Sequence, residues 1–303
     1  MKLAPKIILL VCLFGLGLLV FSLVGYALAM FIFGLELTEF QDFDNYQSIQ
    51  ALKFVQVFVS IGTFIVPAWV FSKVVGYDFS NYLKTNNLNP SLLILVTALG
   101  ISALPMIGWM AEVNLQMTFP DSLAWLEEML RASEESAQRV TEAFLTMNTT
   151  GELLLNLFVV GVLPALGEEL LFRGALQGTL IKHTKNIHLS IWASAALFSF
   201  IHFQFFGFFP RMILGAMFGY LVVWGGSLWY SIWAHFINNG ASVLLMYLIY
   251  KEKIDADFET IGGNSGDWIY VVLSLIIATT LLWTFYVNRR RNLSKIVIES
   301  SLG

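Results

Sequence analysis

Cysteine and charge are scarce in this chain. One cysteine, Cys12, stands among 303 residues, which excludes an intramolecular disulfide and a multi-cysteine metal site. Charged residues make up 13% of the chain and the net charge is −4, so we expect no nucleic-acid partner. Apolar residues reach 57% and the mean hydropathy is +0.72, outside the range of soluble domains. The composition predicts an integral membrane protein whose first partner is the lipid bilayer.

Long apolar runs set the expected fold. A helix needs about 20 residues to cross a hydrocarbon core of about 30 Å. Eight runs approach this length, over residues 7–33, 52–75, 90–109, 153–181, 190–206, 212–226, 228–250 and 268–287. The first follows two lysines, as a signal peptide would, but its apolar stretch is too long for one, so we expect a retained span. The predicted fold is an all-α polytopic bundle of about eight transmembrane helices.

Basic residues fall mainly on one side of this bundle. Short cytoplasmic loops carry an excess of Lys and Arg. With the N-terminus inside, the inner segments hold ten of the seventeen basic residues: Lys2, Lys6, Lys73, Lys84, Lys182, Lys185, Arg289, Arg290, Arg291 and Lys295. Most acidic residues fall on the opposite side. We therefore expect a multi-pass protein of the cell (inner or plasma) membrane with both termini in the cytoplasm.

The chain divides into four regions. A three-span scaffold without charge deep in its spans covers 1–110, an acidic outer segment 111–150, a four-span core 151–250, and an outer loop, last span and basic cytoplasmic tail 251–303. The core contains small residues spaced for close helix approach, as at Gly215 and Gly219. All the unusual polar residues of the spans lie in this core.

The acidic outer segment alternates large apolar residues with glutamates. Leu123, Trp125 and Met129 stand among Glu127 and Glu128. This pattern predicts an amphipathic helix, either resting on the membrane surface or acting as a lid over the site. Asp121 or Ser122 is the expected N-cap.

Two adjacent carboxylates interrupt the fourth span. Glu168 and Glu169 lie within an apolar run, and Arg173 follows one helical turn after the second. Ionisable residues at bilayer depth are costly, roughly 2.5–3.5 kcal/mol each, and are most often functional. Spacing of four residues predicts that Glu169 pairs with Arg173. Glu168 is rotated away and is left as a candidate general base. A purely structural ion pair is the alternative for Glu169 and Arg173.

Histidines stand in two further spans. His202 follows Phe198 by four residues, so we expect the aromatic ring to orient the imidazole. His235 is followed by Asn238 and Asn239 at helical spacing, where an amide can donate to an oxyanion. Each histidine alone could be a packing residue. Three spans that each carry polar groups can satisfy them only by meeting in the bundle interior, which predicts an active site there.

These motifs resemble a known family. The order E-E-x-x-x-R, F-x-x-x-H and H-x-x-x-N on successive membrane helices is similar to the CPBP intramembrane proteases, the group of type II CAAX prenyl endopeptidases and the Abi or lysostaphin-resistance-like proteins. The resemblance covers roughly residues 153–245, about a third of the chain. Each motif alone is short, and the joint order and spacing carry the match.

The resemblance implies an endopeptidase that hydrolyses a peptide bond of a membrane-associated or C-terminal, CAAX-like substrate. Glu168 and His202 would activate a water, and His235 with Asn239 would stabilise the oxyanion. Zn²⁺ or another divalent metal on Glu168, His202 and His235 is equally open, although the sequence lacks H-E-x-x-H. Counting from the span ends places the histidines nearer the cytoplasmic side and suggests access from the inner leaflet.

Two other function classes compete with the protease. The same polar cluster could belong to a non-catalytic scaffold or bacteriocin-immunity-type protein. A transporter is disfavoured because its polar and broken helices would recur in both halves, whereas here they cluster in one half. The protease is the function that we expect from the sequence.

Overall fold

The computed structural model describes residues 2–76, 83, 88–255, 261–264 and 266–301, with residues 289–301 described by their backbone alone. Within them the chain is helical and contains no strand. The helices are α1 (Leu3–Phe33), α2 (Tyr46–Ser60), α3 (Val66–Val75), α4 (Pro90–Leu115), α5 (Ala124–Leu145), α6 (Thr150–Asn156), α7 (Leu163–Glu168), α8 (Gly178–Thr184), α9 (Ile187–Phe200), α10 (Phe208–Gly225), α11 (Leu228–Tyr250) and α12 (Trp268–Ser301).

Three π-helical segments join some of these helices into longer runs. They are η2 (Ile61–Ile65), η6 (Leu157–Val162) and η7 (Glu169–Gln177). As a result, α2 and α3 form one run, Tyr46–Val75, and α6 to α8 form another, Thr150–Thr184. Short 3₁₀ turns, η1 (Leu37–Gln41), η5 (Asp121–Leu123) and η8 (Phe205–Gly207), lie between other helices.

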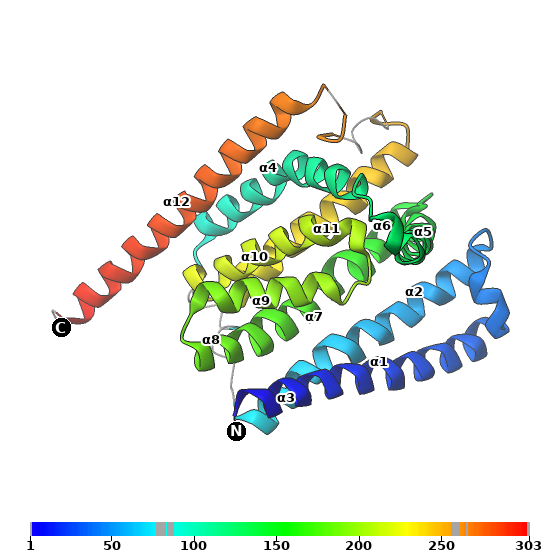
Figure 1. Cartoon of the computed structure of the whole chain (residues 1–303), viewed down its shortest axis with the longest axis horizontal. Coiled ribbons are helices and arrows are strands. Elements are labelled where there is room, and N and C mark those ends of the chain that lie inside the picture. The colour runs from blue at the N-terminus through cyan, green and yellow to red at the C-terminus, as the bar shows by residue number, and fades with distance from the viewer. Residues whose placement is uncertain (1, 77–82, 84–87, 256–260, 265, 302–303) are drawn as a thin grey trace.

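The predicted all-α membrane bundle is confirmed. Seven helical runs in the described part of the chain are long and apolar enough to cross a membrane. The remaining predicted span, the fifth along the chain (residues 190–206), is shorter than expected because α9 ends at Phe200. Its 14 residues rise only about 21 Å at about 1.5 Å per residue. Even so, Figure 1 shows α9 running alongside the other helices of the core.

The helices form three groups side by side (Figure 1). The hairpin of α1 and α2 lies along one flank, and α4 with α12 lies along the other. The run from α6 to α8, together with α9, α10 and α11, lies between them. Both termini lie at the end of the bundle opposite α5. Which end faces the cytoplasm stays a prediction. Of the basic residues on which it depends, Lys84 lies outside the described residues, and four are described by their backbone alone: Arg289, Arg290, Arg291 and Lys295.

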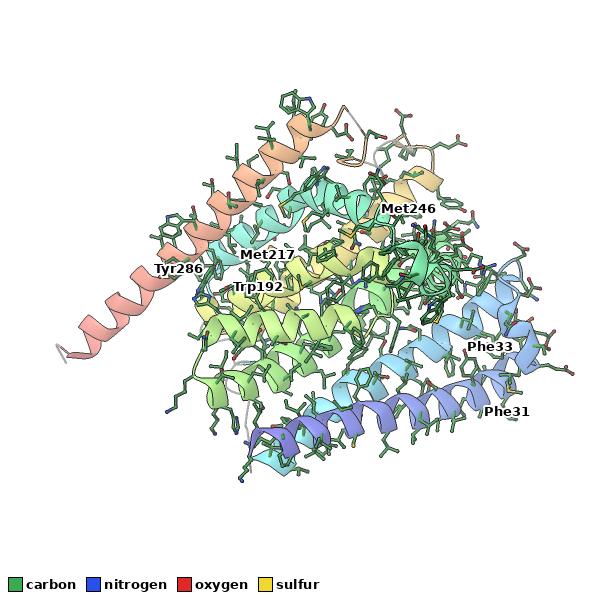
Figure 2. All side chains as sticks on the ribbon, viewed as in Figure 1. Phe31, Phe33, Trp192, Met217, Met246 and Tyr286 are labelled. Atoms are coloured by element: carbon green, nitrogen blue, oxygen red, sulfur yellow. The ribbon has the colours of Figure 1, made fainter. Side chains whose placement is uncertain are left out.

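The outer surface of the spans is apolar. Phe31 near the end of α1 is 88% exposed, and Trp192 on α9 is 40% exposed. Figure 2 shows such side chains along the outside of the bundle. Large apolar residues exposed in this way fit contact with lipid.

Helix α5 is the predicted amphipathic helix, and it runs across the other helices, seen end-on in Figure 1. Its predicted N-cap is wrong. Asp121 falls in the preceding turn η5, and the N-cap position, Leu123, has no side-chain cap. Instead the Glu127 carboxylate accepts the backbone N–H of Phe119 at 2.8 Å. This bond, with the guanidinium of Arg131, holds the pKa of Glu127 below its usual value.

Helix α2 carries a buried lysine that the sequence analysis did not predict. The side chain of Lys53 is only 2% exposed and its Nζ lies 5.7 Å from the centre of the Phe144 ring on α5. Residue 53 stands at the edge of the predicted span 52–75. Because α2 begins at Tyr46, Lys53 instead lies two turns inside the helix. The scaffold therefore also anchors the end of α5.

Gly17 allows α1 to approach the π segment η2 closely. A Cβ atom at Gly17 would lie 1.9 Å from the carbonyl oxygen of Gly62, whereas one at Gly15 would meet nothing within 4 Å. Gly17→Ala should therefore cost about 1–3 kcal/mol through overpacking. Gly15→Ala makes the same chemical change and should be neutral or slightly stabilising, because alanine favours the helix. Thermal unfolding in detergent compares them. Equal melting temperatures would show that α1 does not pack on η2.

Candidate active site

The helical run from Thr150 to Thr184 carries the paired glutamates. It changes from α to π geometry at Glu169, directly after Glu168. Pro164 lies shortly upstream, at the start of α7 and just after another π segment. Proline has no backbone N–H to donate, so it interrupts the regular hydrogen bonding of an α-helix. Short π segments inside α-helices often mark functional positions.

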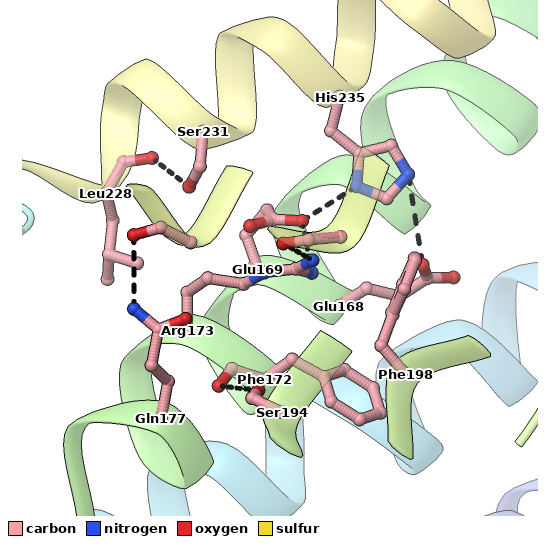
Figure 3. Close-up of polar contacts among 12 residues, drawn as sticks. Glu168, Glu169, Phe172, Arg173, Gln177, Ser194, Phe198, Leu228, Ser231 and His235 are labelled. Atoms are coloured by element: carbon pink, nitrogen blue, oxygen red, sulfur yellow. Dashed lines mark hydrogen bonds and ion pairs between the residues drawn. The ribbon is translucent and has the colours of Figure 1, made fainter. Parts of the chain in front are cut away.

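Glu169 is fully buried and binds two partners from one oxygen atom. Its Oε1 accepts from Arg173 Nη1 at 2.7 Å and lies 2.9 Å from Nδ1 of His235. The predicted pairing of Glu169 with Arg173 is thus present in the structure. The contact with His235 was not predicted, and it joins η7 to α11 (Figure 3).

Arg173 connects Glu169 to two more helices. Its Nη2 donates to the carbonyl oxygen of Gly215 on α10 at 2.8 Å. The guanidinium also lies over the ring of Phe198 on α9, 4.5 Å from the ring centre. Gly215 and Gly219 allow this close approach, and Gly219 accepts a bond from Gln177 in the same way. A buried guanidinium with these partners is held in place from three sides.

His235 lies between the two glutamates. While Nδ1 contacts Glu169, Nε2 lies 3.8 Å from Oε2 of Glu168. Its ring stacks on Phe218, with ring centres 5.1 Å apart. Glu168 makes no hydrogen bond to any described residue and is 8% exposed. Glu169 is therefore committed to its neighbours, and Glu168 is left open to accept a proton from a bound molecule.

His202 lies just beyond the end of α9 and not within a helix, as was expected. The helix ends at Phe200, and Phe203 has a positive φ of 53°, which turns the chain. The predicted contact with Phe198 is nevertheless present. The ring centres lie 5.2 Å apart in an edge-to-face arrangement, and Nδ1 of His202 lies 2.8 Å from the Phe198 carbonyl oxygen. If Nδ1 carries the hydrogen, Nε2 is the free acceptor.

The two asparagines of α11 are hydrogen-bonded to each other, and Asn239 is also hydrogen-bonded to η6. Asn238 Nδ2 donates to Oδ1 of Asn239 at 3.1 Å, and Asn239 Nδ2 donates to the Val160 carbonyl oxygen at 3.0 Å. The side chain of Asn239 is therefore fixed in orientation. An amide group has two N–H bonds, so one remains for a ligand.

A cavity of about 330 Å³ collects these side chains. Its lining residues are Ile107, Ala111, Glu168, Phe198, His202, Gly207, Pro210, Arg211, Leu214, Phe218, His235, Asn238 and Asn239. Four of the six predicted site residues therefore share one cavity. The other two, Glu169 and Arg173, are absent from this lining. Glu169 contacts His235, and Arg173 contacts Glu169.

The cavity extends from the middle of the bundle to the end where α5 lies. Three of its lining residues lie at that end: Ala111 on α4, Gly207 in η8 and Arg211 on α10. Which membrane face the site lies nearer stays a prediction. His235 lies seven residues after the start of α11, whereas His202 lies beyond the end of the short α9, in the turn that follows it.

Helix α5 contacts this turn directly. Ser133 Oγ donates to the Phe203 carbonyl oxygen at 3.2 Å. The Arg131 guanidinium lies 4.3 Å from the centre of the Phe206 ring. These contacts with α5 hold the turn that carries His202 in place.

Metal binding by Glu168, His202 and His235 stays a prediction. In the described part of the chain, no three His, Cys, Asp or Glu side chains form a group that could hold a metal ion. Glu168 and His235 approach each other at 3.8 Å, and His202 lines the same cavity without completing such a group. We therefore assign no step of a reaction to a metal.

Sequence reasoning missed Arg211. It lies at the boundary between two predicted spans, where a basic residue is ordinary, and the structure places it in the lining of the cavity. If the sixth predicted span had been extended to include the first turn of α10, which begins at Phe208, Arg211 would have stood out as a further charged residue at membrane depth.

Comparison with known proteins agrees with the motifs. Residues 150–241 match the family described as type II CAAX prenyl endopeptidase Rce1-like. No curated protein and no solved structure matches the chain. The matched segment begins at α6 and ends within α11, so it contains every predicted site residue. The match confirms the predicted resemblance to the CPBP intramembrane proteases and indicates a protease.

Removing one partner of the buried pair should be costly. Arg173→Ala leaves Glu169 charged and buried, which costs about 3–5 kcal/mol. Arg131→Ala breaks an ion pair of the same spacing on α5 that is partly exposed, and it should cost far less. Unfolding by SDS titration measures both. A loss at Arg173 no greater than that at Arg131 would contradict a central role for the buried pair.

Proposed function

We propose that this member of the CPBP protease family hydrolyses a peptide bond at the cavity, with Glu168 as the general base. The observation that supports this most directly is the contrast between the two glutamates. Glu169 binds Arg173 and His235, whereas Glu168 has no hydrogen bond within the described chain and lines the cavity with His202. An uncommitted carboxylate beside an imidazole can hold and activate a water.

The first step is attack by this water on the substrate carbonyl carbon. Glu168 takes one proton from the water as the new carbon–oxygen bond forms and the carbonyl π electrons move to oxygen. Nε2 of His202 accepts the second hydrogen of the water as a hydrogen bond and so orients it. The fixed contacts of His202 with Phe198 set the direction of this bond in advance.

The developing oxyanion needs donors. As an imidazolium, His235 would donate through Nδ1 to Glu169 and through Nε2 toward the cavity. Asn239 would add its remaining N–H, since its other donor is held by Val160. Donors fixed before the reaction stabilise the charge without reorganisation.

In the second step the carbon–nitrogen bond breaks. Its electron pair goes to the leaving nitrogen, which takes the proton from Glu168. The products are a carboxylic acid and an amine, and Glu168 returns to its starting form. Glu169 and Arg173 do not take part directly, and they position His235.

Glu168→Gln should abolish peptide cleavage, because the amide cannot accept the proton. General acid–base groups contribute roughly 10²–10⁴-fold to rate, so we expect a loss of at least that size. Glu128→Gln, an exposed residue of α5, makes the same chemical change away from the cavity and is the control. Purified protein in detergent is incubated with C-terminal peptides of membrane proteins, and new termini are read by mass spectrometry. Full activity in Glu168→Gln would refute the assignment.

The same assay settles whether a metal takes part. If the residues act without a metal, a chelator should leave cleavage unchanged, and His202→Gln should still lower it about 10²-fold or more. Loss of cleavage in the chelator, restored by added Zn²⁺, would assign the metal that the motifs left open. Absence of cleavage by the wild type under all conditions would favour the non-catalytic scaffold.

A further inference from the structure

A second cavity, of about 130 Å³, lies in the core. It shares no lining residue with the first cavity, which holds the candidate active site. Two polar and four aliphatic side chains surround it: Arg173, Gln177, Ile181, Ile187, Val222 and Val223. Along α10, Val222 follows Arg211 of the first cavity by about three turns, or roughly 16 Å. Figure 1 shows the neighbouring α8 near the N-terminus, so the second cavity lies toward the end of the bundle opposite α5.

Arg173 separates the two cavities. It lines the second, whereas Phe198 and Phe218 line the first. Its guanidinium carbon lies 4.5 Å from the centre of the Phe198 ring and 5.5 Å from the centre of the Phe218 ring. One charged side chain and two aromatic rings therefore stand between the cavities. A molecule in the second cavity would contact Arg173 without entering the first.

Three buried side chains of η7 each have a polar atom without a hydrogen-bond partner in the described chain. They are Oε2 of Glu169, Nε of Arg173 and Oε1 of Gln177. The three residues recur at every fourth position, so they follow one another about one turn apart (Figure 3). Their exposed fractions are 0%, 2% and 1%, which excludes bulk solvent as the partner. Buried polar atoms in proteins are nearly always hydrogen-bonded, either to protein or to ordered water.

Gln177 and Arg173 give the second cavity an acceptor and a donor. Nε2 of Gln177 donates to the Gly219 carbonyl oxygen at 3.2 Å, which leaves Oε1 as an acceptor. A Cβ atom at residue 219 would lie 2.5 Å from this oxygen, so Gly219 provides the space that it needs. Nε of Arg173 can only donate. The inner end of the cavity therefore suits a molecule that both accepts and donates hydrogen bonds.

Charge and size limit what this molecule can be. The charge of Arg173 is already paired with Glu169 at 2.7 Å, so a neutral ligand fits better than an ion. A water molecule takes up about 30 Å³ in the liquid, so the cavity has room for a few. The walls away from Arg173 and Gln177 are aliphatic and leave these two groups as the binding positions.

The cavity extends from a buried end to an exposed one. Gln177 is buried, whereas Ile187 at the other end of the lining is 41% exposed. Ile187 is the first residue of α9. It follows a polar turn, Lys182-His183-Thr184-Lys185-Asn186. The exposed end of the cavity is thus beside a segment that water can solvate.

We infer that the second cavity is a water-binding inlet. Water enters beside the polar turn, binds to Oε1 of Gln177 and Nε of Arg173, and so hydrates the buried ion pair from the side opposite the candidate active site. The ion pair needs these hydrogen bonds whether or not a peptide is cleaved. The inlet is therefore a further site that does not depend on the proposed peptidase function.

The first test detects the water in the wild-type protein in detergent. X-ray pulses convert water to hydroxyl radicals, which oxidise the side chains beside it, and mass spectrometry locates the oxidised residues. Val222 is buried but lines the inlet, so it should be oxidised. The matched control is its neighbour Leu221, which is also buried and lines neither cavity, and it should stay unmodified. Absence of oxidation at Val222 would contradict the inference.

The second test closes the inlet. Val223→Phe places a ring at a half-buried position of the wall and should abolish oxidation of Val222. Gln177→Leu keeps the approximate size of the side chain but removes the acceptor, and it should lower this oxidation. The control is Val24→Phe, the same change as at Val223 but on the exposed face of α1, which should leave the oxidation as in the wild type.

The outcome is independent of any cleavage assay. Oxidation of Val222 that is lost in Val223→Phe and lowered in Gln177→Leu supports the inlet even if no peptide is cleaved. Equal oxidation in the wild type and in both variants overturns it, because the radicals would then arise outside the cavity. If Val223→Phe does not fold, as judged by its melting temperature, the comparison of the wild type with Gln177→Leu decides the question. A wild type that cleaves peptides but shows no oxidation at Val222 refutes the inlet and leaves the peptidase proposal in place.

Discussion

The centre of this protein depends on a carboxylate that has no access to water. Glu169 is completely buried, and its Oε1 contacts both Arg173 and His235. Through Arg173 it reaches the backbone of α10 at Gly215 and the aromatic ring of Phe198 on α9. Four segments of the core thus meet at one charge. In a medium of low dielectric constant, a buried charge is costly unless it is paired, so these contacts constrain how the four segments pack.

The adjacent glutamate has the opposite environment. Glu168 shares its chemistry and its sequence neighbourhood with Glu169, yet it faces a cavity and has no hydrogen bond within the described chain. Because Arg173 pairs with Glu169, its guanidinium makes no direct ion pair with Glu168. The buried pair therefore has a second consequence besides packing: it leaves one carboxylate free for the chemistry that we propose. His235 connects the two, with one ring nitrogen toward each glutamate.

The position of the cavity relates the core to the segment that precedes it. Helix α5 crosses the end of the bundle (Figure 1) and contacts the turn that carries His202 through Ser133 and Arg131. Arg211 lines the cavity near this end. The acidic helix is thus more than a surface element, since it fixes the turn on one side of the cavity. Lys53, buried against Phe144, fixes the other end of the same helix.

Much of this protein could be predicted from its sequence. Apolar runs long enough to cross a membrane indicated the all-α bundle, because a segment in lipid must make all its backbone hydrogen bonds internally, as a helix does. The four-residue spacing of Glu169 and Arg173 indicated their pairing, and the three motifs together indicated the family that residues 150–241 match. These features depend on local geometry, which a sequence specifies directly.

Only the tertiary structure decided the remaining features. The contact between His235 and Glu169 joins residues 66 positions apart, and no spacing rule predicts it. Arg211 was predicted to lie between two spans, and the structure places it in the lining of the cavity. Lys53 was predicted to lie at the edge of a span, and it lies two turns inside α2 because that helix begins earlier than expected. His202 left its expected helix because a turn follows Phe200. In each case the position of a charge depends on which helices pack around it, and that is decided by the whole bundle.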